Sequence, residues 1–493
     1  MSTRETTRAL ARLSASAVMR RMRSLVAAAD ADGLYLVGGA LRDALLGRAV
    51  ADFDFVYGGD VSALAERLAR AWPARLVALN ERWGLIRLVP RAGPEKEAPA
   101  VLDFAPLRGA DIREDLRQRD FTVDAMAVPV TGGAGEKSGG ILDPTGGMAD
   151  LRDRNVRMVH PDRLREDPVR CLRAFRIACS LEGAIDPGTL EGIRSEGRRV
   201  PAAAPERIRE ELCKLLAFPS SHAQLSSMGE AGLLGSLFPE LEPLKGLEQG
   251  THHGLDAWDH SLEAVRALES LIRDGLRVFV PWSSELTTWV GEEKDRVCVL
   301  KLAALLHDVG KPLTATSSGS GQVHFYGHER RGGEMAAAIG TRLRMSRKDQ
   351  EALAAWVGHH MWPLHLYRAA SLGKLTDRAR VRFFRRLGAS APGCLLLAAA
   401  DQEAKGVKAA GQDAGAESFR AFVRSMLDLF YDRDAAALRV PPFVTGRDLM
   451  QAFGLRPGPQ IGRLLEGIHE ARVAGKVRNR EEALALAGRL LGR

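Results

Sequence analysis

The chain has few cysteines for its length, and they form no metal-binding or disulfide pattern. Its 493 residues contain five of them, scattered as Cys171, Cys179, Cys213, Cys298 and Cys394. No two are spaced as Cys-x-x-Cys, which excludes a zinc ribbon, and the odd count argues against a disulfide framework. We therefore expect a reducing, cytoplasmic location.

Long apolar runs and internal repeats are also lacking. No stretch is long enough to span a membrane, so we expect no membrane partner. A hydrophobic content of 45% over 493 residues is ample for several packed domains. Acidic residues are outnumbered by basic ones, and the formal net charge is +8. This balance is a weak indication of a nucleic-acid partner.

Acidic residues are scarcest at the N-terminus. Among the first 28 residues, Glu5 stands against six arginines: Arg4, Arg8, Arg12, Arg20, Arg21 and Arg23. The composition resembles that of an organellar transit peptide. Because the whole chain is rich in alanine, glycine and arginine, we interpret residues 1–30 as a basic leading helix.

Residues 36–54, LVGGALRDALLGRAVADFD, combine groups that bind phosphate and metal. Gly38 and Gly39 follow a short apolar strand, and glycines before a helix let backbone N–H groups approach phosphate. Arg42 can hold a phosphate through two hydrogen bonds. Asp52 and Asp54 would point to one side of a strand and repel unless a cation lies between them. Mg²⁺ suits such ligands, so the segment predicts phosphoryl or nucleotidyl transfer rather than a turn with solvated acids.

Three further motifs follow. They are RDFTVDA, which contains Arg119 and Asp120, then DPTGGMADL, and then EDPVRCLRAFR. In the last of these, Pro168 suits the first turn of a helix. Asp167, Arg170 and Arg173 would then lie along one face of that helix. This face is either a binding surface or a stripe of charges that only contacts solvent.

These motifs, together with the acid pair and ERIREELCKLL, occur in the order seen in bacterial class II tRNA nucleotidyltransferases. That family comprises CCA-adding enzymes and their relatives, the poly(A) polymerases and the CC- or A-adding variants. The resemblance spans roughly residues 34–216. It implies that the chain adds CCA, or part of it, from CTP and ATP to the 3′ end of tRNA, releasing pyrophosphate; alternatives are a partial CC- or A-adding enzyme or a poly(A) polymerase.

The resemblance also implies residue roles. Asp52 and Asp54 would be catalytic and hold Mg²⁺, and Asp103 is either a third carboxylate at the metals or a buried structural acid. The residues implied to bind the nucleotide are Gly38, Gly39, Arg42, Arg119, Asp167, Arg170 and Arg173. A carboxylate accepts from the amine of cytosine or adenine and an arginine donates to ring acceptors, so Asp167 and Arg170 would select C and A.

Two positions depart from the family pattern Arg-Arg-Asp-Phe-Thr-Ile-Asn-Ala. Gln118 replaces its first arginine, and Asp124 replaces its asparagine. An asparagine amide both donates and accepts hydrogen bonds, whereas the Asp124 carboxylate only accepts them. We expect this exchange to change how a ribose or a neighbouring loop is held. The chain also lacks the Arg-Phe-Gln-Leu-Ala run of bacterial poly(A) polymerases, which favours a tRNA enzyme.

Nine of the twelve histidines fall between residues 252 and 365. The segment LHDVGKP resembles the signature of HD-domain metal phosphohydrolases, and imidazole with carboxylate suits Mn²⁺, Fe or Ni²⁺. The resemblance implies a first metal site and a second one that includes one of His359 or His360. The candidate ligands are His260, His307, Asp308 and Asp401, with His328, His359 and His360 for the second ion. Lys311 would hold a substrate phosphate, and the implied activity is phosphatase or 2′,3′-cyclic phosphodiesterase, with an eroded scaffold as the alternative.

We expect an α+β fold, in which a nucleotidyltransferase head with a small mixed β-sheet precedes an all-α neck, an HD domain and a helical tail. The oligomeric state is left open. The expected divisions are residues 1–30 for the leading helix, 31–155 for the head, 156–250 for the neck, 251–403 for the HD domain, 404–440 for a linker and connecting helix, and 441–493 for the tail.

Overall fold

The computed structural model describes twelve stretches of the chain. They are residues 3–28, 33–50, 52–72, 74–80, 84–90, 101–131, 140–249, 254–317, 323–405, 413–431, 443–473 and 476–492. The chain divides into two compact units: residues 1–211 with 227–236, and residues 212–226 with 237–493. Each unit is described below by itself.

The first unit contains a six-stranded mixed sheet in the order β3-β4-β5-β2-β1-β6. Only β2 and β5 run parallel, and every other neighbouring pair is antiparallel. Five of these strands coincide with short apolar runs that predict strands in the sequence, at residues 33–37, 53–57, 85–89, 101–104 and 125–130, whereas β3 was not predicted. The strands are β1 (Leu34–Val37), β2 (Asp52–Tyr57), β3 (Ala74–Asn80), β4 (Leu85–Pro90), β5 (Val101–Pro106) and β6 (Ala127–Pro129).

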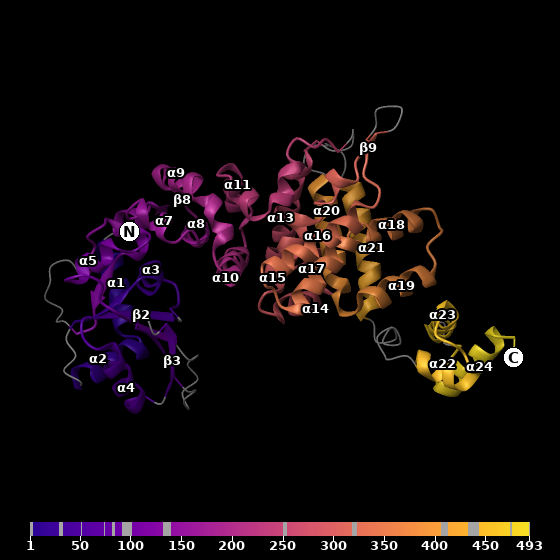
Figure 1. The fold of residues 1–493 in the computed structure, drawn as a ribbon, viewed down its shortest axis with the longest axis horizontal. Helices are drawn as coiled ribbons and strands as arrows, with labels where there is room; N and C mark the ends of the chain where they lie inside the picture. The colour runs from indigo at the N-terminus through magenta and orange to yellow at the C-terminus, as the bar shows by residue number, and fades with distance from the viewer. Residues whose placement is uncertain are drawn as a thin grey trace. The chain divides into compact units, whose positions relative to one another are not determined.

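Helices surround this sheet and extend beyond it (Figure 1). The expected single leading helix is two helices, which are separated by Ala15 and Ser16. The helices are α1 (Thr3–Ser14), α2 (Ala17–Ala28), α3 (Gly39–Leu45), α4 (Val61–Ala71), α5 (Ile112–Arg117), α6 (Gly147–Arg152), α7 (Asp162–Glu166), α8 (Arg170–Leu181) and α9 (Pro187–Glu196). A two-stranded parallel ladder joins β7 (Asn155–Val156) to β8 (Ala184–Ile185).

Three helices lie where the chain passes between the units. They are α10 (Pro205–Leu216), α11 (His222–Glu230) and α12 (Leu233–Leu237). Residues 212–226, which run from the second half of α10 into α11, belong to the second unit. Residues 227–236, which run from the end of α11 into α12, belong to the first unit.

The second unit is a helical bundle in which α13, α15, α16, α17 and α20 contact one another through apolar faces. Its helices are α13 (Ala257–Arg273), α14 (Ser283–Gly291), α15 (Arg296–Leu306), α16 (His328–Arg342), α17 (Arg347–His359), α18 (Trp362–Ser371), α19 (Asp377–Leu387), α20 (Ala391–Lys405) and α21 (Asp413–Tyr431). Helix α21 lies within residues 404–440, for which the sequence predicted a linker and a connecting helix. A short ladder joins β9 (Thr316–Ser317) to β10 (Val323–His324).

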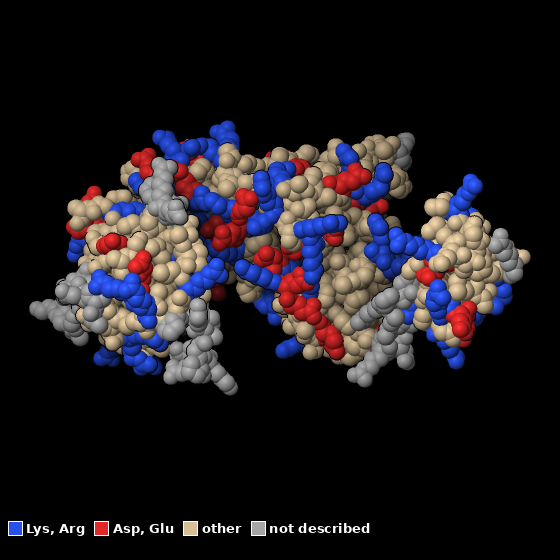
Figure 2. Space-filling view, turned by 60° about the horizontal axis from the view of Figure 1, so that its bottom comes forward, with Lys and Arg blue, Asp and Glu red and all other residues tan. Residues whose placement is uncertain are grey.

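The last helices, α22 (Gly446–Phe453), α23 (Pro459–Val473) and α24 (Arg480–Leu490), surround a small core of their own that includes Val444, Leu449 and Leu464. Basic and acidic side chains are interspersed over the surface in Figure 2 rather than collected into one field. No helix within the described stretches is both long and apolar enough to cross a membrane.

Candidate active site and candidate metal centre

Asp52 and Asp54 lie on one face of β2. Burial alternates along the strand: Phe53 and Phe55 point into the core, and the two aspartates point out. Strand pairing places Asp54 beside Val37 on β1 and beside Asp103 on β5. The two carboxylates therefore lie next to the strand that leads into the glycine pair.

Gly38 lies close to the side chains of Asp54 and Arg119. Its φ of +69° is a conformation that side chains with a Cβ rarely adopt. A Cβ built at Gly38 would lie 3.3 Å from Asp54 Oδ2 and 3.4 Å from Arg119 Nη1. The fold thus brings together Gly38, Asp54 and Arg119, which are far apart in sequence. Any residue larger than glycine at position 38 would crowd the other two side chains.

The environment of Asp54 favours a bound cation. Desolvation by the surrounding protein raises the pKa of Asp54 to about 6, against a lowering effect of Arg119. The negative charges of Asp103, Asp124 and Asp52 raise it further. Asp54 is nevertheless solvent-accessible, because it lines an open face of the sheet rather than the core. Accessible oxygen ligands with surplus negative charge fit Mg²⁺, which accepts carboxylates together with substrate phosphates.

Asp103 is neutralised by a partner within the sheet. Arg87 on β4 donates two hydrogen bonds of 2.7 Å to its carboxylate. This pair supports the structural alternative for Asp103, since its oxygens are already engaged.

Arg42 does not extend as a free phosphate ligand in this structure. Its guanidinium is buried and donates to Asp124 Oδ1 at 2.6 Å and to Asp43 Oδ1 at 3.1 Å. Burial lowers the pKa of Arg42, but Asp124 and Asp43 raise it by more, so the side chain stays charged. The departure from the family at Asp124 therefore has a structural consequence: it supplies a carboxylate that holds Arg42.

Asp167 and Pro168 lie between two helices. Helix α7 ends at Glu166 and α8 begins at Arg170, so Asp167 adopts an extended conformation between them. Pro168 explains the break, because proline disfavours helical backbone in the residue before it. Asp167 still lies near Arg170, with 3.9 Å between Oδ2 and Nε, and it forms a shorter ion pair of 2.6 Å with Arg207.

Arg173 connects three of the sequence motifs. Its guanidinium donates to Asp120 Oδ2 at 2.8 Å and to Glu211 Oε1 at 3.3 Å, and Glu211 also accepts from Arg176 at 2.6 Å. Asp120 lowers the cost of desolvating this half-buried arginine. In return, the arginines keep the pKa of Asp120 below its usual value, although desolvation by itself would raise it. Arg173 is thus a brace between the head and α8 in this structure.

The histidine pattern converges on one buried cluster in the bundle. His260 Nε2 lies 2.9 Å from Asp401 Oδ1, and His307 Nε2 lies 3.1 Å from Asp308 Oδ2 and 3.6 Å from Asp401 Oδ1. His328 Nε2 lies 3.3 Å from Asp308 Oδ1. These side chains come from α13, α16, α20 and the turn after α15, which only the bundle brings together.

The imidazole orientations suit metal coordination. The Nδ1 atoms of His307, His328 and His360 each lie 2.8 Å from a backbone carbonyl oxygen, those of Ala304, Phe325 and Val357. Each Nδ1 therefore carries the proton, and each Nε2 lone pair points into the cluster. His307 Nε2 is buried without a well-aligned hydrogen bond. Metal-bound histidines show this same arrangement, with the second ring nitrogen bonded to a carbonyl.

Two groupings in the cluster have the spacing of a metal site. Ligand atoms of His260, His307 and Asp401 lie within 4.8 Å of one another, as do those of His307, Asp308 and His360. The geometry therefore selects His360. His359 lies outside the cluster, where its Nδ1 bonds to Ala355 O and its Nε2 lies 3.4 Å from Arg386 Nε.

Lysines balance the carboxylates of this cluster. Lys311 Nζ donates to Asp308 Oδ2 at 2.5 Å, and Lys405 Nζ donates to Asp401 Oδ2 at 2.9 Å. Lys311, which the sequence offered as a phosphate ligand, is 8% exposed and already paired with Asp308 and Gln249. Lys405 was not predicted, although its position four residues after Asp401 on α20 would have suggested the pair.

Four family models match successive segments of the chain. They are the poly(A) polymerase head domain over residues 34–157, a probable RNA- and SrmB-binding site of polymerase A over 184–245, the HD domain over 258–402, and a putative tRNA nucleotidyltransferase domain 2 over 441–487. An A-adding tRNA nucleotidyltransferase of Deinococcus radiodurans is 34% identical, and the match covers 93% of this chain and 95% of that relative. The chain belongs to the tRNA nucleotidyltransferase family.

Other members of the tRNA nucleotidyltransferase family show the same relationship. A CC-adding enzyme of Thermus thermophilus is 33% identical over 91% of this chain and 92% of its own length. The solved CCA-adding enzyme in complex with CTP aligns over 99% of both chains with a TM-score of 0.62 and 20% identity. The Thermotoga maritima CCA-adding enzyme complexed with tRNA aligns over 96% and 95%, with a TM-score of 0.57 and 20% identity. These two structures share the fold.

Several residues of this family member that hold the site were missed in the sequence. Arg207 pairs with Asp167, Glu211 holds Arg173, and Arg87 neutralises Asp103. Arg207 and Glu211 both lie in the ERIREELCKLL motif, so a search of that motif for charges complementary to EDPVRCLRAFR would have found them. Arg87 gave no such signal, because its pairing depends on the register of β4 and β5.

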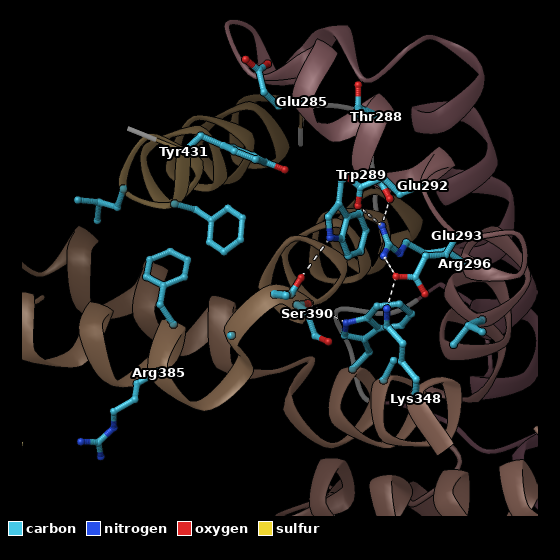
Figure 3. A pocket seen from close by; sticks show the side chains of 18 of the residues that line it. Glu285, Thr288, Trp289, Glu292, Glu293, Arg296, Lys348, Arg385, Ser390 and Tyr431 are labelled. Carbon is cyan, nitrogen blue, oxygen red and sulfur yellow. Dashed lines mark hydrogen bonds and ion pairs between the residues drawn. The ribbon is translucent and has the colours of Figure 1, made fainter. Parts of the chain in front are cut away.

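A large cavity in the second unit does not contain the histidine cluster. It measures about 1160 Å³ and has an aromatic wall that includes Trp289, Trp356 and Phe430. Its charged side chains are engaged with one another: Figure 3 shows Arg296 and Lys348 meeting Glu293. The histidine cluster lies elsewhere in the bundle, so we do not place the reaction in this cavity.

Proposed function

We propose that the head transfers nucleotides from CTP and ATP to the 3′ end of tRNA. The observation that carries this proposal is the exposed face of β2, where Asp52 and Asp54 point to one side and Asp54 lies next to Gly38 and Arg119. In the reaction, the terminal RNA hydroxyl attacks the α-phosphorus, a new P–O bond forms, and the bond to the β-phosphate oxygen breaks as pyrophosphate leaves. Mg²⁺ held by Asp52 and Asp54 would supply charge neutralisation and a lower pKa for the attacking hydroxyl.

The residues of this chain would position the reactants. The backbone at Gly38 and Gly39, where α3 begins, presents N–H groups to a triphosphate, and Arg119 adds positive charge beside Asp54. Asp167 and Arg170 would recognise the base, because their acceptor and donor match cytosine and adenine. Arg42 and Arg173, which are held by carboxylates in this structure, would support these groups or turn to the nucleotide when it binds.

The extent of addition is a separate proposal. Three relatives by sequence that match over more than nine-tenths of this chain are named A-adding or CC-adding, whereas the multifunctional CCA protein of Pseudomonas aeruginosa matches over 69% of the chain. We therefore give partial addition, of CC or of the terminal A, equal standing with complete CCA addition.

The free cysteines support a reducing, cytoplasmic setting.

Three tRNA transcripts test both points. They end at the discriminator base, at C, and at CC, and each is incubated with the full chain, Mg²⁺ and labelled CTP or ATP. Label from CTP only on the first two transcripts indicates CC addition, label from ATP only on the third indicates A addition, and label in every appropriate case indicates CCA addition. Long, untemplated A tails would indicate a poly(A) polymerase. No label from either nucleotide would contradict the proposal.

We also propose that the bundle cluster binds a divalent transition metal and acts on phosphoesters. The buried Nε2 atoms that face Asp308 and Asp401 support this second activity. Calorimetric titration of the full chain with Mn²⁺ or Ni²⁺ should show one tight site. His307→Ala should lower the affinity of this site for the metal at least tenfold. Hydrolysis of 2′,3′-cyclic nucleotides should fall with it. Equal metal binding by the variant would contradict the proposal.

A further inference from the structure

A second pocket in the bundle is lined by cations and aromatic rings alone. It measures about 490 Å³ and is formed by His359, Trp362, Arg382, Arg385 and Arg386. No carboxylate lines it. An open pocket with several like charges and no counterion within it is suited to an anionic ligand.

Helix α19 presents the three arginines together. Val381, Phe384 and Leu387 on its other side are buried in the bundle. Arg382, Arg385 and Arg386 follow the spacing i, i+3 and i+4, so they occupy one exposed face. Figure 3 shows Arg385 pointing away from the large aromatic cavity.

These arginines differ from others on the bundle surface in their pairing. Arg380 on the same helix pairs with Asp377 at 3.1 Å, and Arg347 on α17 pairs with Glu351 at 2.9 Å. Within the described stretches, no acidic side chain lies within 4.0 Å of the guanidinium nitrogens of Arg382, Arg385 or Arg386. Their charge is therefore available to a ligand.

The aromatic wall is held in place. The rings of His359 and Trp362 stack with centroids 5.6 Å apart, and Trp362 meets Phe383 edge to face at 5.4 Å. His359 Nδ1 faces the carbonyl oxygen of Ala355 and so carries the proton, which leaves Nε2 as the acceptor toward Arg386 Nε. A fixed planar surface thus adjoins three guanidinium groups.

We propose that this pocket binds single-stranded RNA, with a phosphate held by Arg382, Arg385 and Arg386 and a base stacked against Trp362 or His359. Guanidinium groups bind phosphate oxygens through paired hydrogen bonds, and aromatic side chains stack on unpaired bases. His359 and His360 are consecutive, so the pocket adjoins the histidine cluster. The proposal rests on RNA being the substrate of the chain, and a free nucleotide has the same phosphate and base chemistry.

The test compares Arg385→Gln/Arg386→Gln with a matched control, Arg331→Gln/Arg347→Gln. Both pairs remove two exposed arginines from the bundle, but the control arginines are engaged with Glu334 and Glu351. Fluorescence anisotropy measures binding of the full chain to a tRNA with its single-stranded 3′ end, to the same tRNA without it, and to labelled AMP, at several salt concentrations.

We expect the pocket variant to raise Kd for the tRNA with a 3′ end by about tenfold and to reduce the salt slope by about 1, because the contact with one phosphate is lost. The control should stay within about twofold of the unmodified chain. Trp362→Leu should weaken binding only when the single-stranded end is present, and its melting temperature shows whether the bundle still folds.

Three results would overturn the proposal: unchanged RNA affinity and salt slope in Arg385→Gln/Arg386→Gln, an equal loss in the control, or a loss confined to AMP. The last result would identify a nucleotide pocket instead. This test is independent of catalysis, since RNA binding is measured without CTP or ATP. A chain that binds RNA through the pocket but incorporates no label would contradict the proposed transferase activity alone.

Discussion

Replacement of Glu269 by glutamine should destabilise the helical bundle. The Glu269 carboxylate is buried on α13 and accepts from the Ser221 amide and hydroxyl at 2.6 Å each, from Lys301 Nζ at 2.8 Å, and interacts with His222 Nδ1 at 2.8 Å. Lys301 on α15 is itself 1% exposed. The network therefore joins α13 and α15 to the segment 212–226.

Two arguments give similar values for the free energy by which the Glu269 network stabilises the bundle. Burial raises the pKa of Glu269, but hydrogen bonds from His222 and the charge of Lys301 lower it more, to about 2 from an ordinary 4.5. A shift of this size corresponds to about 3 kcal/mol at neutral pH. Removal of one member of a buried ion pair costs roughly 3–5 kcal/mol, because the other charge loses its partner. Lys301 would lose its anionic partner, although Phe218 O and Ser221 Oγ would still accept hydrogen bonds from its Nζ.

Thermal unfolding followed by tryptophan fluorescence measures this effect, since five of the seven tryptophans lie in the second unit: Trp258, Trp282, Trp289, Trp356 and Trp362. A loss of about 3 kcal/mol should lower Tm by roughly 6–12 °C. The control is Glu351→Gln, which breaks an exposed pair with Arg347 on the same unit and should change stability by under about 1 kcal/mol.

The pH dependence follows from the depressed pKa. The stabilisation is complete above the unfolded-state pKa of about 4.5 and is lost as pH falls toward the folded-state value of about 2. The difference in Tm between the unmodified chain and Glu269→Gln should therefore be constant near neutrality and shrink below about pH 4.5. A Tm for Glu269→Gln within about 2 °C of the control at pH 7 would refute the reasoning.

Three further predictions concern the residues proposed to take part in nucleotide transfer. Asp52→Asn and Asp54→Asn should each lower nucleotide incorporation by about 10³-fold with little change in Tm, because both side chains are exposed and serve the cation rather than the core; retained activity would exclude them as metal ligands. Asp124→Asn should lower KM for CTP and ATP about two- to fivefold, since it removes a negative charge near the triphosphate while Asp43 still holds Arg42; a raised KM would show that the carboxylate is needed there. Asp167→Ala should reduce discrimination against UTP and GTP by about tenfold or more in incorporation assays, whereas an unchanged preference would assign base choice elsewhere.

Local patterns located the main sites because their signals are short-range. The i, i+2 spacing of Asp52 and Asp54 gave their common face as soon as β2 was recognised as a strand. The apolar runs gave five strands of the sheet. Strand β3, ARLVALN, was missed because its solvent-facing positions include Leu76 and Leu79, which obscure the alternation.

The amino-acid sequence by itself indicated the reaction class, through motifs that resemble those of a known family, and it supplied the candidate ligands, since short motifs can be read without knowing the fold. Tertiary structure decided which of these residues meet. It placed His360 rather than His359 in the cluster, turned Arg42 toward Asp124, and set Asp167 beside Arg207. Such pairings join segments tens of residues apart or more, and their geometry follows from strand register and helix packing rather than from any local pattern.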